Sequence, residues 1–128
     1  MMGTARGTFD IKIEQAPPEL EGAVNRYDFT KTFHGDLAGS GAGVMLSCGD
    51  PESGAAGYVA IETVRARLGD RSGSFALQQL GMISGGSSTL HYQVVPGSGQ
   101  DALKGITGTL QLTISPNGRH DYELAYEL

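Results

Sequence analysis

The residue with the clearest chemical potential is Lys31, which alternates with two aromatic residues, Phe29 and Phe33, along a predicted strand. Alternate residues of a strand share a face, so the amine is expected on a side that should be dry. Removal of an ammonium group from water lowers its pKa, which would make Lys31 a base or an amine nucleophile. The interpretation we favour is that Lys31 lies near a strand end and extends its amine to water, because buried lysines are rare.

Three further polar residues, Gln79, Tyr92 and Tyr126, fall on otherwise apolar faces. Buried polar groups need partners, and an apolar pocket with a few convergent polar groups is typical of a small-molecule site. If the site is catalytic, the candidates are Lys31, Gln79 and Glu62. The residues expected to contact a ligand are aromatic and lie on the apolar faces: Tyr27, Phe29, Phe75, Tyr92, Tyr122 and Tyr126.

Glu62 belongs to a strand, residues 57–68, that is apolar on both sides, and the following turn decides where the carboxylate points. A two-residue turn would place Glu62 inside, as a candidate acid or base with a raised pKa. A three-residue loop over residues 69–71, which we favour, places it outside. In that case an apolar patch is exposed that is typical of a subunit interface and predicts a homo-oligomer: Tyr58, Ala60, Val64, Ala76 and Leu80.

Other chemistries find little support. The formal net charge of -5 argues against a nucleic-acid partner, and no run of Lys or Arg suggests a membrane surface. The three histidines lack metal-ligand spacing, so we expect no metal. Residues 96–99 resemble a phosphate loop but lack its lysine and helix, so we expect no nucleotide or other cofactor. The N-terminus lacks the apolar core of a signal peptide, and we expect a cytoplasmic protein.

The elements that must position these residues are β-strands. A chain of 128 residues is long enough for one domain, residues 1–128, with a single core. Apolar and polar residues alternate in about eight segments, and no segment has a helical period. Twenty glycines are spread along the chain at the ends of such segments, as in sheet proteins with many turns. We predict an all-β fold, a closed antiparallel barrel of about eight strands, because closure removes exposed edges.

The C-terminal segments predict their own register. A Ser-Pro-Asn-Gly turn at residues 115–118 separates two alternating runs, and proline and glycine suit a three-residue hairpin loop. If Ser115 pairs with Arg119, then Leu112 faces Tyr122, and turn chemistry and hydrophobic pattern agree.

The apolar face of each strand is assigned to the interior. Near the middle of the chain, residues 35–43 are too rich in glycine for a regular strand and are expected to turn a corner. A short strand, residues 44–48, follows and should place Val44 and Leu46 inside, with Cys48 as a buried, inert thiol.

Several stretches resemble an uncharacterised bacterial family, a domain of unknown function. They are FHGDLAG (33–39), YVAIE (58–62), RSGSFALQ (71–78), VVPGSG (94–99), LKGITGTL (103–110) and HDYELAYEL (120–128). The family is similar in fold to the allene oxide cyclase barrels, which are related in shape to lipocalins. The resemblance therefore implies an eight-stranded barrel with an apolar lumen, but no established reaction. Many family members carry histidine where this chain has Gln79, so a histidine base is not available here.

Three functions fit these observations. The first is a small-molecule-binding barrel with an apolar lumen. The second is a cofactor-free cyclase or isomerase that folds a reactive chain and excludes water. The third is a structural barrel with a filled core.

Overall fold

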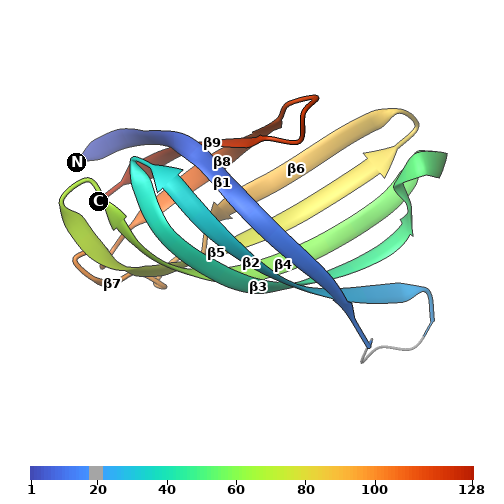
Figure 1. Cartoon of the computed structure of the whole chain (residues 1–128), viewed down its shortest axis with the longest axis horizontal. Coiled ribbons are helices and arrows are strands. Elements are labelled where there is room, and N and C mark those ends of the chain that lie inside the picture. The colour runs from blue at the N-terminus through green and yellow to red at the C-terminus, as the bar shows by residue number, and fades with distance from the viewer. Residues whose placement is uncertain (18–21) are drawn as a thin grey trace.

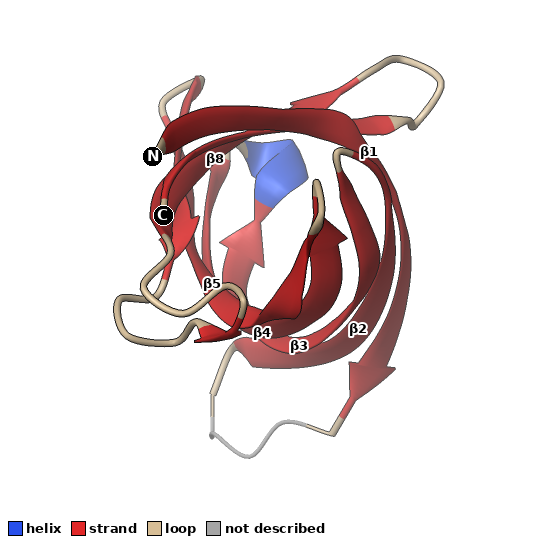
Figure 2. Ribbon diagram, turned by 90° about the vertical axis from the view of Figure 1, so that its left-hand side faces the viewer, coloured by secondary structure: helices blue, strands red, loops and turns tan. Residues whose placement is uncertain are grey.

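The alternating segments form nine strands in the part of the chain that the structure, a computed structural model, describes: residues 1–17 and 22–128. They curve into a ring (Figure 1 and Figure 2). The strands are β1 (Met2–Ala16), β2 (Val24–Gly35), β3 (Leu37–Asp50), β4 (Ala55–Leu68), β5 (Arg71–Ser84), β6 (Ser87–Val94), β7 (Gln100–Asp101), β8 (Thr107–Ile114) and β9 (His120–Glu127). One short 3-10 helix, η1 (Pro51–Ser53), precedes β4.

Every strand pairing is antiparallel, and the sheet closes on itself. Neighbours follow the order β4-β3-β2-β1-β9-β8-β6-β5, and β4 also pairs with β5, from Leu68 with Arg71 to Ala55 with Ser84. The two-residue β7 is an extra strand that pairs with β5. The predicted closed barrel of eight strands is therefore confirmed, with one additional short strand.

The C-terminal hairpin has the predicted register. Leu112 pairs with Tyr122, and Leu110 pairs with Leu124. The Ser115 backbone N–H donates to the Arg119 carbonyl at 2.9 Å, and Gly118 adopts a φ of 86°. Turn residues and hydrophobic pattern thus specified the same pairing.

The prediction for the middle of the chain was wrong. Residues 37–50 form one continuous strand, β3, whose inner face carries Gly39, Gly41 and Gly43, while Val44 and Leu46 face outward. The glycines make room for larger side chains: a Cβ at position 43 would lie 2.6 Å from Phe29 Cζ and 2.7 Å from Glu62 Cβ. Since the interior needs small residues here, the hydrophobic pattern of β3 is inverted.

One end of the barrel is solid. The core there includes Phe33, Leu37, Phe75 and Leu124. The connection between β6 and β8 closes this end, because Leu103 and Ile106 on it are 0% and 1% exposed. We call this the closed end.

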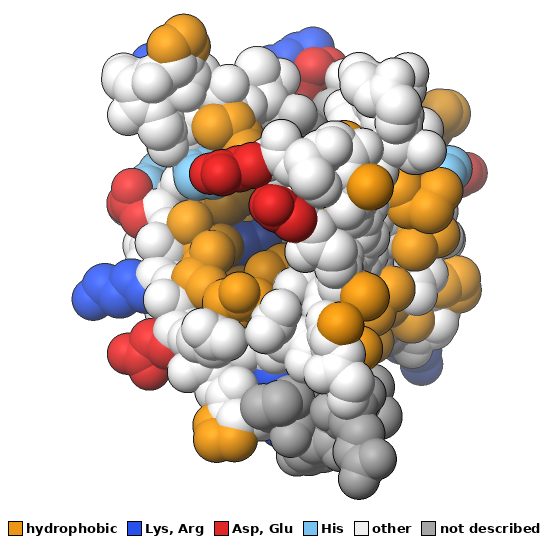
Figure 3. Space-filling view, turned by 90° about the vertical axis from the view of Figure 1, so that its right-hand side faces the viewer, with side chains coloured by type: hydrophobic (Ala, Val, Ile, Leu, Met, Phe, Trp, Pro, Cys, Tyr) orange, Lys and Arg blue, Asp and Glu red, His pale blue; other side chains and the backbone are white. Residues whose placement is uncertain are grey.

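The opposite end, where β1, β3, β5 and β8 finish, lacks such a plug among the described residues. Figure 3 shows it as a hollow with hydrophobic side chains around its rim and a basic side chain at its base. We call this the open end.

Candidate functional site

A charged cluster lies inside the barrel between the two ends. Lys31 on β2, Glu62 on β4 and Tyr92 on β6 all face inward and are 5%, 2% and 2% exposed. Lys31 Nζ donates to Glu62 Oε1 at 2.9 Å and to the Tyr92 hydroxyl at 2.7 Å. The Tyr92 hydroxyl donates to the same carboxylate oxygen at 2.6 Å. Three strands distant in sequence therefore meet in one closed hydrogen-bonded triangle, which we call the Lys31 cluster.

Aromatic rings surround the ammonium group. Lys31 Nζ lies 4.5 Å from the ring centroid of Phe9, 5.2 Å from those of Phe29 and Tyr92, and 6.0 Å from that of Phe33. The faces of aromatic rings attract cations, most strongly where water is excluded. This cage offsets part of the cost of removing the charge from water.

Burial favours the uncharged form of both Lys31 and Tyr92. Removal from water lowers the pKa of Lys31, although the Glu62 carboxylate opposes this change. Burial and the negative charge of Glu62 raise the pKa of Tyr92 well above its ordinary value. Tyr92 thus keeps its proton at neutral pH and donates it to Glu62, as the geometry requires.

The second carboxylate oxygen of Glu62, Oε2, lies outside the hydrogen-bonded triangle. Among the described residues, Glu62 Oε2 is a buried side-chain oxygen without a hydrogen-bond partner. A Cβ at position 41 would lie 3.3 Å from this oxygen, so Gly41 leaves the space beside it open. An unsatisfied acceptor of this kind is costly, and a role in proton exchange or ligand contact is one explanation for its presence.

Above the cluster, the open end contains a cavity of about 690 Å³. Its wall includes Tyr27, Met45, Tyr58, Leu90 and Leu112. The Tyr58 hydroxyl donates to Gln79 Oε1 at 2.7 Å, and Gln79 is the pairing neighbour of Tyr92. Burial, and then the charge of Glu62, raise the pKa of Tyr58, so this phenol also stays neutral. A polar pair therefore lies between the apolar cavity and the Lys31 cluster.

Comparisons with known proteins agree with this architecture. Residues 5–126 match the family DUF3224, which is described as "Protein of unknown function (DUF3224)". The chain belongs to the DUF3224 family. A crystal structure of a DUF3224 protein of unknown function from Shewanella oneidensis MR-1 is similar to this one, with 39% sequence identity and a TM-score of 0.92. The match covers 100% of this chain and 98% of that chain. The comparison with curated proteins finds no match.

The DUF3224 barrel brings together only some of the predicted site residues. Lys31, Glu62 and Tyr92 form the cluster, Gln79 lies beside it, Tyr27 lines the cavity, and Phe29 is buried next to Lys31. The other three predicted ligand-binding residues belong to or pack on the core at the closed end: Phe75, Tyr122 and Tyr126. The Tyr122 hydroxyl is occupied by backbone groups there, since it donates to the carbonyl of His34 or Leu37 and accepts from Leu37 N–H.

The predicted position of Glu62 was wrong, and so was most of the predicted patch, although Leu80 is 48% exposed. Leu68 pairs directly with Arg71, so only Gly69 and Asp70 form the turn, and Glu62 faces inward. Ala60 and Val64 share its face and are buried, and Tyr58 lines the cavity. Two-residue turns are the commonest hairpin loops, and this preference was the signal that could have corrected the prediction.

Lys31 was also misplaced by the interpretation we favoured, because its amine is buried and paired rather than extended to water. Cys48, predicted to be buried, is exposed. Two residues of the cavity wall, Met45 and Tyr58, were not predicted as ligand contacts. Alternation would have placed both inside once the turn at Gly69 and the inverted β3 were known.

Some site types are not formed by the residues that the structure describes. Within 1–17 and 22–128, no three His, Cys, Asp or Glu side chains gather closely enough to hold a metal ion. No helix in these ranges has the length and apolar character needed to cross a membrane.

Proposed function

We propose that this DUF3224 protein binds an uncharged, largely apolar small molecule in the cavity at the open end. The observation that carries the proposal is a cavity of about 690 Å³ with a mainly apolar wall that includes Tyr58, whose hydroxyl donates to Gln79 behind it. Typical small-molecule pockets have volumes of about 300–1,000 Å³ and the same mixture of surfaces.

The polar pair suggests what the ligand carries. Tyr58 uses its proton on Gln79 Oε1, which leaves the Gln79 amide nitrogen without an acceptor among the described residues. A ligand oxygen that accepts a hydrogen bond, in a ketone, aldehyde, ether or epoxide, complements this group. The buried charges of Lys31 and Glu62 already cancel, so a carboxylate or amine on the ligand would bring an uncompensated charge.

Calorimetric titration with 2-alkanones of nine to thirteen carbons tests the proposal. We expect saturable binding that Leu90→Trp weakens at least about tenfold, because the larger ring fills the cavity. The matched control is Gln111→Trp, since Gln111 lies on the neighbouring strand β8 but is exposed on the outer surface. Gln79→Leu should weaken binding roughly two- to tenfold, the effect of one hydrogen bond. Failure of all the ketones to bind, or equal binding by Leu90→Trp, would overturn the proposal.

A second candidate is a cofactor-free cyclase or isomerase, the activity that the sequence resemblance to the allene oxide cyclase barrels implies. It is favoured by the short hydrogen bond between Tyr92 and Glu62, 2.6 Å, beneath the polar pair. Such a group could move a proton to or from an oxygen held at Gln79. Turnover of an unsaturated epoxide that falls with Gln79→Ala and Lys31→Met, while the variants stay folded, would support catalysis. Binding without turnover would leave the first proposal standing alone.

A further inference from the structure

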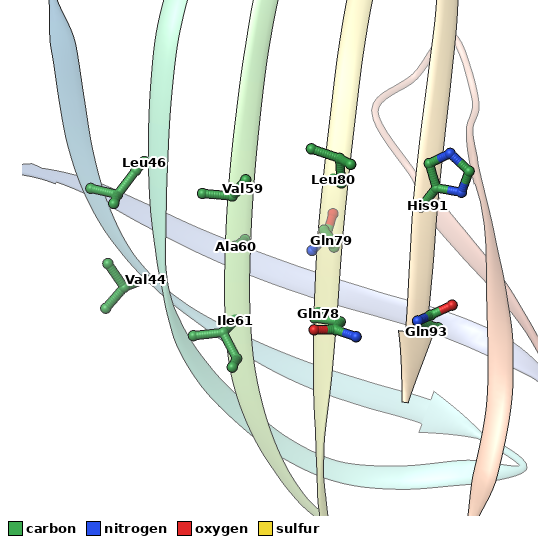
Figure 4. A pocket seen from close by; sticks show the side chains of 10 residues that line it. All are labelled: Val44, Leu46, Val59, Ala60, Ile61, Gln78, Gln79, Leu80, His91 and Gln93. Carbon is green, nitrogen blue, oxygen red and sulfur yellow. The ribbon is translucent and has the colours of Figure 1, made fainter. Parts of the chain in front are cut away.

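The outer surface of the barrel has an aliphatic face that the lumen does not explain. It consists of Val44 and Leu46 on β3, Val59 and Ile61 on β4, and Leu80 on β5 (Figure 4). Strand register makes it continuous, because Val44 pairs with Ile61, Leu46 with Val59, and Val59 with Leu80. Val59, Ile61 and Leu80 are 48%, 55% and 48% exposed.

The composition of β3 is opposite to that expected for a barrel strand surrounded by water. Its inner face carries glycines at positions 39, 41 and 43, while Val44 and Leu46 lie outside. Neighbouring atoms explain the inner glycines: Phe29 and Glu62 fill the space beside Gly43, Glu62 and Phe33 lie beside Gly41, and Ala66 lies beside Gly39. These neighbours do not explain branched aliphatic side chains on the outer face, which are stabilising only if something covers them.

The surroundings of the face are uncharged. A shallow groove of about 490 Å³ runs over it, and all ten lining residues are neutral or aliphatic apart from His91, with Gln78 and Gln93 at one side. The chain as a whole has a net charge of -5. Two copies of one acidic protein repel each other over most of their surface, but not across a face without carboxylates.

We propose that a second copy of this chain covers the aliphatic face in a two-fold symmetric dimer. An isologous interface needs a self-complementary surface, and the glutamine amides, which both donate and accept hydrogen bonds, provide one. On β2, Arg26 and Asp28 pair with Leu46 and Val44 at the edge of the face. Arg26 and Asp28 form an ion pair within one chain at 3.2 Å, so this border adds no net charge that would repel the same border of a second copy. An anionic lipid surface would instead require several cations around the face, and the lining residues include none.

Sedimentation equilibrium of the purified full chain at about 1–100 µM tests the dimer. We expect twice the mass of one chain, and Ile61→Lys should raise the dissociation constant at least about thirtyfold, because an unpaired charge would be buried at the centre. Thr63→Lys is the matched control: it adds the same charge to an exposed outer position of the same strand, one step beyond the face. Circular dichroism spectra of both variants check that the barrel is folded.

The outcomes are distinct. A monomeric native chain at 100 µM, or a dimer of equal affinity in Ile61→Lys, would overturn the proposal. A trimer or larger ring would overturn the two-fold arrangement. Binding of a monomeric native chain to neutral phosphatidylcholine vesicles, lost in Ile61→Lys, would assign the face to lipid instead.

Discussion

The two ends of this barrel are built from the same strands but hold different contents. At the closed end, the connection between β6 and β8 inserts Leu103 and Ile106, and the interior is solid. At the open end, the described connections are tight turns or the short η1, and a cavity of about 690 Å³ remains. Closure of a sheet therefore does not decide whether a small barrel is filled. A single connection does, by supplying or withholding the side chains of a plug.

The Lys31 cluster lies at the boundary between these two ends. The core at the closed end gives it a dry environment, and the cavity gives a ligand access to the polar pair beside it. A buried ion pair is weak evidence for stability, because a well-packed apolar group of similar size often serves as well. Its presence at this boundary is better explained by a role in the site than by a contribution to stability.

The largest effect is expected from Lys31→Met, which leaves the buried Glu62 carboxylate without its ion-pair partner. We expect a loss of about 3–5 kcal/mol in the free energy of unfolding, measured by urea denaturation. The double variant Lys31→Met, Glu62→Leu removes both charges and should recover most of this loss.

The double variant also separates fold from function. If the cluster serves the site, the double variant should form the folded barrel but be impaired in ketone binding or in epoxide turnover. A double variant as unstable as Lys31→Met, with unchanged ligand binding, would show that the cluster belongs to the framework of the barrel.

A smaller contrast is expected between leucines at the two ends. Leu103→Ala should lower the free energy of unfolding by about 2–5 kcal/mol, since it opens a void in a packed plug. Leu90→Ala, at a residue that is 39% exposed at the cavity mouth, should cost about 1 kcal/mol or less. Urea denaturation of the two variants, compared with the native chain, checks the difference. Equal losses would mean that the open end is as tightly packed as the closed one.

The sequence predicted the barrel well because its strongest signals are local. Alternation and turn chemistry agree in the C-terminal hairpin, where Leu112 and Tyr122 pair as expected. They disagree in β3, where glycines occupy the inner face because residues on neighbouring strands fill the space, as Phe29 and Glu62 do beside Gly43. That reason lies on other strands, so no pattern within β3 could show it.

Only part of the site was predicted, because contacts between its residues depend on how distant strands pair. Each member of the Lys31 cluster was recognised as unusual, but the contact between them depends on the turn at Gly69 and Asp70. One residue more in that turn would have moved Glu62 outside and left Lys31 without its carboxylate. The distances within the Lys31 cluster follow from strand register. The register of β4 and β5 depends on the length of the turn at Gly69 and Asp70.

The smallest predicted effect is on the pH dependence of stability, and it tests whether water is excluded from Tyr92 in the Lys31 cluster. The pKa of Tyr92 is raised in the folded chain, mainly by burial. The native state therefore keeps this proton at a pH where the unfolded chain has lost it, so the stability linked to Tyr92 is present below about pH 10 and declines as pH rises through the folded value. Lys31 has the opposite sign, because its lowered pKa makes its contribution more favourable as pH rises towards 10.5. Tyr92→Phe removes the first contribution, together with the hydrogen bond that Lys31 donates to this hydroxyl. We expect the free energy of unfolding of this variant, measured by urea denaturation between pH 9 and 11.5, to fall less steeply than that of the native chain. Parallel curves would mean that Tyr92 ionises as freely as a phenol in water, and that the boundary is open to solvent.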